Sequence, residues 1–89
     1  MPVPVLIITP IRSFGQLIQQ ALHEIGSYKA VLTHSGAEAV EQAREREFAL
    51  AVLDAGISDI NLADLVIALR KAAEGLHLIG ISIDETSGS

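Results

Sequence analysis

Asp54 is the residue whose type and position most suit a chemical role. It directly follows the apolar run 48–53, which has the composition of a buried strand, and a loop of small and polar residues comes next. The carboxyl ends of buried strands are where α/β proteins place their binding and catalytic groups. An aspartate at a strand end also commonly caps the following turn. Its position alone leaves both interpretations open.

The motifs of several other chemistries are missing. The chain has no Cys, which excludes disulfides, thiolate catalysis and zinc–thiolate sites. No GxGxxG follows the apolar run 5–8, so a dinucleotide site lacks its phosphate-binding glycines. His23-Glu24 begins like a zinc-protease helix, but the second His of that motif would fall at Ser27. We therefore expect no catalytic residue, no metal site, no cofactor and no enzymatic activity.

The charge balance limits the partners. The 89 residues carry a net charge of −5, and the few Lys and Arg residues form no patch, which argues against a nucleic-acid-binding surface. No apolar stretch reaches the ~20 residues that span a bilayer, and the first residues lack the basic and cleavage features of a signal peptide. These features predict a cytoplasmic domain with protein partners and no membrane contact.

Short apolar runs alternate with amphipathic stretches along the chain. Apolar residues at spacings of three and four predict helices, and continuous apolar runs predict buried strands. Gly26 and Gly75 end two of the helices, Ser35 and Glu38 form a capping box at the second, and Asn61 caps the third. The predicted strands are 5–8, 28–33, 48–53 and 76–83, and the predicted helices are 11–25, 36–47 and 62–74, with Pro10 in the first helical turn.

This βαβαβαβ order predicts an α/β fold with a parallel sheet and helices on both faces. Residues 1–83 form the predicted domain. The last six residues, 84–89, are small and polar and are expected to form a flexible tail.

The order and spacing of several segments resemble the receiver domain of two-component response regulators. The segments are 5–8, 21–26, 35–40, 50–54 and 79–82. The resemblance implies a flavodoxin-like three-layer sandwich with strand order 2-1-3-4, without the family's fifth strand and last helices. It also implies that Asp54 matches the phosphoacceptor and Ser82 matches the switch residue that senses the phosphoryl group.

The departures from the family concern its phosphorylation machinery. Thr9 and Pro10 stand where the family has the acidic pair that holds Mg²⁺ together with the phosphoacceptor. Ser58 and Leu62 replace the usual Pro and Gly of the following loop, and the chain stops before the strand that brings the family's Lys. The resemblance therefore implies a degenerate receiver, or pseudo-receiver, without the charge stabilisation that phosphoryl transfer needs.

The last predicted strand suggests a contact surface. Ile79, Ile81 and Ile83 alternate with other residues, so one side of the strand is strongly apolar, and no later strand or helix covers it. Exposed apolar faces and strand edges favour association. We expect a homodimer through the fourth strand and the uncovered sheet face, unless the remainder of a longer protein covers them.

Three functions remain open at this point. The first is a receiver-like signalling or interaction module that is not competent for Mg-dependent phosphorylation. The second is a conventional receiver whose Asp54 accepts a phosphoryl group from a histidine kinase. It would need Mg²⁺ and another metal-holding group, for which Asp59 or Asp84 is the candidate. The third is a flavodoxin-like fragment that binds a small ligand, which no sequence motif supports.

Overall fold

Strands and helices alternate through the part of the chain that the structure, a computed structural model, describes, which is residues 2–81. The order of the elements is the predicted one. The strands are β1 (Val3–Ile8), β2 (Tyr28–Thr33), β3 (Leu50–Asp54) and β4 (His77–Ile81), and the helices are α1 (Arg12–Ile25), α2 (Gly36–Glu45) and α3 (Leu62–Ala72).

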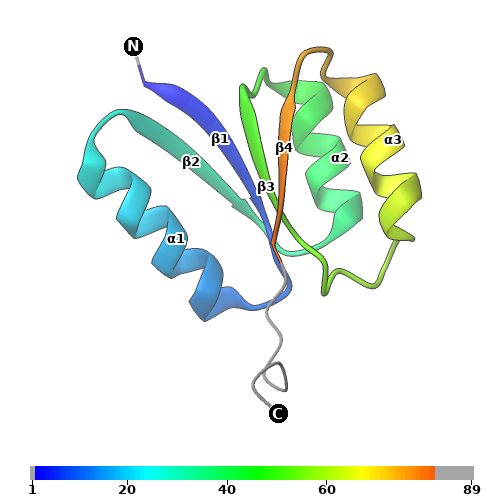
Figure 1. The fold of residues 1–89 in the computed structure, drawn as a ribbon, viewed down its shortest axis with the longest axis horizontal. Helices are drawn as coiled ribbons and strands as arrows, with labels where there is room; N and C mark the ends of the chain where they lie inside the picture. Colours follow the sequence, from blue (N-terminus) through cyan, green and yellow to red (C-terminus); the bar gives the residue numbers. More distant parts are fainter. Residues whose placement is uncertain (1, 82–89) are drawn as a thin grey trace.

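The strands form one parallel sheet in the order β2-β1-β3-β4, as predicted. Figure 1 shows α1 on one side of this sheet and α2 and α3 on the other. Right-handed crossovers through helices produce this three-layer arrangement. All strands run in the same direction, so the first turn of α1, the end of β3 and the following loop gather at the carboxyl ends of the strands.

The centre of the sheet explains the apolar composition of the first strand. Val5, Leu6, Ile7 and Ile8 are fully buried, because β1 has a neighbouring strand on each edge and helices over both faces. The main core lies between the sheet and the pair α2 and α3. It contains Leu6, Ile8, Ala39, Ala43, Phe48, Ala51, Leu53, Ile57, Leu65, Leu69 and Leu76.

The helix ends follow the sequence signals in most places. Gly26 ends α1 in the left-handed region, at φ 85°, and its N–H donates to the His23 carbonyl. The Ser35 hydroxyl accepts from the Glu38 N–H at 3.1 Å, as predicted. The return bond of the capping box differs, because the Glu38 carboxylate accepts from the His34 N–H at 2.8 Å and not from Ser35.

Several boundaries differ from the prediction by one or two residues. Ile11 is extended and serves as the N-cap of α1, so Pro10 lies just outside the helix and not in its first turn. The helices α2 and α3 end earlier than predicted, because Arg46 and Ala73 adopt extended backbone conformations. The predicted end of the fourth strand, 82–83, and the predicted tail lie outside the described residues.

Over the outer half of the sheet, the side that carries α1 is open among residues 2–81. Helix α1 contacts β1 and β2, whereas Leu50 and Val52 on β3 are only half-buried and Ile79 on β4 is 47% exposed. Leu17 and Ile25 on α1 are 65% and 64% exposed. We call Leu50, Val52 and Ile79 the bare face, and their exposure agrees with the apolar sheet surface that the sequence predicts.

Candidate functional site

The candidate site is a hydrogen-bonded pair, Thr9 and Asp54, at the carboxyl ends of β1 and β3. Ile8 pairs with Leu53 across the two strands, so the residues that follow them become neighbours. The Thr9 hydroxyl donates to Asp54 Oδ2 at 2.7 Å. Both side chains are buried, with exposed fractions of 0% and 2%. A carboxylate at this depth needs such a partner, because burying it without hydrogen bonds is costly.

The second oxygen of Asp54 is held by the loop that follows it. Asp54 Oδ1 accepts from the Gly56 N–H at 2.8 Å, and the Asp54 carbonyl accepts from the Ile57 N–H at 3.1 Å. The side chain therefore caps the turn after β3, which confirms the structural interpretation of this residue. Both carboxylate oxygens are engaged, one by a hydroxyl and one by the backbone.

Thr9 is fixed as firmly as its partner. Its hydroxyl accepts from the Ile11 N–H at 3.2 Å, and its own N–H donates to the Thr33 carbonyl at 3.1 Å. His34 Nδ1 lies 3.4 Å from the Thr9 carbonyl. The hydroxyl thus has a defined position between the start of α1 and Asp54, where it fills the space beside the carboxylate.

Asp59 has a structural role that the sequence analysis missed. Its two carboxylate oxygens accept from the N–H groups of Gly36 and Ala37, at 2.8 and 3.0 Å, so it caps the N-terminus of α2. These bonds hold the pKa of the Asp59 carboxyl below its ordinary value, because they favour the charged form. The hypothesis that Asp59 helps Asp54 to hold a metal is therefore wrong in its placement, since its carboxylate is turned to the helix end.

The other predicted site residues do not join the pair. Pro10 is exposed beside it, and no group of three or more His, Asp or Glu side chains that could hold a metal ion occurs within residues 2–81. Ser82, the expected switch residue, and Asp84 lie outside the described residues. Nor does any helix in the described part have the length and apolar character to cross a membrane.

One sequence signal points to the turn that holds Asp54. The spacing Asp54-Ala55-Gly56 is typical of a turn in which the side chain binds the backbone N–H two residues later. The bonds of Thr9 to Asp54 and of Asp59 to α2 join distant parts of the chain, and only the packed sheet brings their partners together.

No protein-family model matches the chain, and no curated protein matches it. Solved structures do. A response regulator from Burkholderia pseudomallei, solved with a phosphorylated aspartic acid, a calcium ion and citrate, superposes with a TM-score of 0.84 at 16% identity, over 97% of this chain and 50% of that one. A receiver domain from Methanospirillum hungatei JF-1 gives 0.81 at 16% identity, over 99% and 70% of the two chains. A sensor protein from Polaromonas sp. JS666 gives 0.81 at 25%, over 97% and 70%.

These structures define the class of fold. The chain has the flavodoxin-like fold of response-regulator receiver domains. Its own described sheet has four parallel strands in the order β2-β1-β3-β4. The chain spans half the length of the Burkholderia protein.

Proposed function

We propose that the chain is a receiver-like signalling and interaction module of a two-component response regulator, which works without Mg-dependent phosphorylation of Asp54. The hydrogen bond from the buried Thr9 hydroxyl to Asp54 carries this proposal. A neutral side chain occupies the place beside the carboxylate where the resemblance implies an acid. The module would act in the cytoplasm through protein contacts and has no proposed catalytic role.

The residues at the pair do not fit Mg²⁺. This ion prefers oxygen ligands in strict octahedral geometry and keeps several of its waters. Asp54 is 2% exposed, and both of its oxygens already accept hydrogen bonds, from Thr9 and Gly56. A cation at Oδ2 would compete with the Thr9 hydroxyl, and a cation at Oδ1 would compete with the Gly56 N–H that holds the turn after β3. Because Thr9 and Pro10 supply no second carboxylate, nothing in the described residues offsets that cost.

Incubation with acetyl phosphate and MgCl₂, followed by intact-mass spectrometry, tests the proposal. We expect no phosphoryl adduct on the wild-type chain, and the same spectrum for Asp54→Asn. A conventional receiver domain treated in parallel provides the positive control. An adduct on the wild type that is lost in Asp54→Asn would contradict the proposal. It would favour a conventional receiver, which a histidine kinase phosphorylates.

The protein partner that we propose is a second copy of the chain, contacted through β4 and the bare face. The His77 N–H donates to the Ala49 carbonyl and the Ile81 carbonyl accepts from Ala55, so these residues direct their backbone groups toward β3. Leu78 and Gly80, in the alternate positions, direct theirs toward the open edge. If the β4 strands of two copies paired antiparallel, the outward N–H and C=O groups of Leu78 and Gly80 would gain hydrogen-bond partners. The exposed Ile79 of each copy would then lie close to that of the other.

Light scattering after size exclusion tests this partner. We expect a dimer for the wild type and a monomer for Gly80→Pro, since proline removes an outward N–H and leaves the bonds to β3 intact. A monomeric wild type at high concentration would contradict the dimer and would leave the phosphorylation proposal unaffected.

A further inference from the structure

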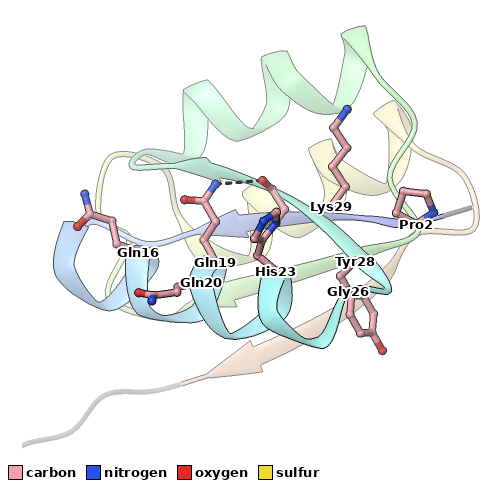
Figure 2. A pocket seen from close by; sticks show the side chains of 9 residues that line it. Pro2, Gln16, Gln19, Gln20, His23, Gly26, Tyr28 and Lys29 are labelled. Carbon is pink, nitrogen blue, oxygen red and sulfur yellow. Dashed lines mark hydrogen bonds between the residues drawn. The ribbon is translucent and has the colours of Figure 1, made fainter.

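The outer edge of β2 lies beside a cavity in the described part of the molecule. The cavity has a volume of about 700 Å³ and opens between α1 and β2. Figure 2 shows the side chains that line it, with Gln16, Gln19 and His23 along α1 and Tyr28 on β2. The cavity lies away from Thr9 and Asp54, so the proposed function makes no use of it.

The backbone of β2 offers hydrogen-bonding groups to this cavity. The Val3 N–H donates to the Ser27 carbonyl and the Thr9 N–H donates to the Thr33 carbonyl, so the odd-numbered residues of this segment face β1. In a parallel pair the residues between them direct their N–H and C=O groups to the other side. Tyr28, Ala30 and Leu32 therefore direct N–H and C=O groups to the outer edge of the described sheet, where no strand pairs with them.

One side chain already binds this ladder. Gln19 Nε2 donates to the Ala30 carbonyl at 3.0 Å, which Figure 2 marks with a dashed line. A primary amide has the donor and acceptor of a peptide group, so Gln19 occupies a position that the N–H of an added strand would occupy. The bond shows that the edge of β2 accepts an amide donor from this side.

The helix wall of the cavity also suits a polypeptide backbone. Gln16, Gln19, Gln20 and His23 follow the helical spacing of three and four residues, so they form one polar row along α1. Each amide of this row can both donate and accept. Lys29 adds a cation, and no lining residue is acidic, so the rim favours an acidic side chain on the occupant.

We propose that this groove binds an extended, acidic segment of a partner protein, which adds to the sheet as a strand outside β2. Strand addition obtains affinity from main-chain hydrogen bonds and specificity from alternate side chains. Here the outward N–H and C=O groups of Tyr28, Ala30 and Leu32 would make the main-chain hydrogen bonds. The side chains of Tyr28 and of the glutamine row would contact the side chains of the added strand and so give specificity. A nucleotide is a poorer occupant, because Lys29 and His23 are the only basic groups in the lining.

Peptides selected from a random phage-displayed library on the immobilised chain serve as the probe. The best peptide is synthesised, and its Kd is measured by fluorescence polarisation for the wild type and two proline variants. Ala30→Pro removes an outward N–H from the β2 edge, and Leu62→Pro places a proline at the first position of α3, where the N–H has no intrahelical acceptor. We expect the first to weaken binding at least about tenfold, which is about 1.4 kcal/mol, and the second to leave it unchanged.

Hydrogen exchange of the wild type keeps the test valid if Ala30→Pro fails to fold. On addition of the peptide, the amides of Tyr28, Ala30 and Leu32 should gain protection, because each acquires an acceptor. Equal affinity for Ala30→Pro, protection at Leu78 and Gly80 instead, or a library that yields no binding peptide would overturn the proposal.

Discussion

Two aspartates near the end of β3 have different surroundings, although Asp54 is the last residue of the strand and Asp59 lies in the loop that follows it. Asp54 is buried, and its oxygens accept from the Thr9 hydroxyl and the Gly56 N–H. Asp59 is exposed, and its oxygens accept from two N–H groups at the start of α2. The first lies where the resemblance implies the phosphoacceptor, and the second is a helix cap.

The difference shows that the neighbours of a carboxylate, and not its place at a strand end, determine its chemistry. A helix N-terminus favours the charged carboxylate directly, which explains the lowered pKa of Asp59. Asp54 has one neutral hydroxyl and one backbone donor beside it, and neither supplies the negative charge that would help it to hold a cation. At both positions the carboxylate accepts backbone N–H groups, from a turn at Asp54 and from a helix end at Asp59.

The largest change to this comparison should come from restoring the acids. The double variant Thr9→Asp with Pro10→Asp places new carboxylates beside the buried Asp54. Because like charges repel in a buried site, we expect the free energy of unfolding to fall by about 3–5 kcal/mol without metal. MgCl₂ should recover part of that loss, and it should leave the wild type unchanged.

Thermal unfolding with and without MgCl₂ measures this effect. A double variant whose Tm ignores MgCl₂ would show that the missing acids are not what prevents metal binding in this chain.

A smaller effect should come from deleting the hydroxyl. Thr9→Val leaves a buried carboxylate oxygen without its donor, and we expect a loss of about 1.5–3 kcal/mol. Thr33→Val is the matched control, because this buried hydroxyl donates to the neutral Ile7 carbonyl at 2.8 Å and should cost about 0.5–1.5 kcal/mol. Urea unfolding gives both values. Equal losses of unfolding free energy would mean that the hydrogen bond to Asp54 stabilises the fold no more than the bond to the Ile7 carbonyl does.

The smallest effect should come from the exposed aspartate. Asp59→Asn removes the charge at the start of α2, so the variant should be slightly less stable than the wild type near neutral pH. Hydrogen bonds from the start of α2 lower the pKa of Asp59 in the folded chain, so its stabilisation is present above the ordinary carboxyl pKa and is lost as the pH falls through the folded value. Urea midpoints for both proteins between neutral pH and about pH 3 should therefore converge. If the difference in urea midpoint between the two proteins does not change with pH, the charge of Asp59 is not the cause of that difference.

The fold could be predicted from local signals because they agree with the packing. The continuous apolar run at Val5–Ile8 is typical of a strand buried on both faces, and β1 is the central strand. The caps at Gly26, Ser35 and Asn61 are local signals, and all three hold. Helix ends were less predictable, since residues such as Arg46 and Ala73 continue a helical pattern after the backbone has become extended.

The site could be predicted only in part, because its hydrogen bonds depend on strand register. The sequence indicates that Asp54 ends a strand and that Thr9 stands in place of an acid. It does not indicate that the Thr9 hydroxyl donates to Asp54 Oδ2, because that bond needs β1 and β3 to end side by side. Asp59 was assigned to the wrong partner for the same reason, since its cap joins two different loops.

A magnesium titration monitored by NMR tests the central claim most directly. The amide signals of Ala55 and Gly56 report on the turn that Asp54 holds, and a cation bound to the carboxylate would change the electrostatic environment of the Gly56 N–H that donates to it. We predict that MgCl₂ produces no saturable shift of either signal in the wild type. Saturable shifts in the wild type that disappear in Asp54→Asn would contradict the account.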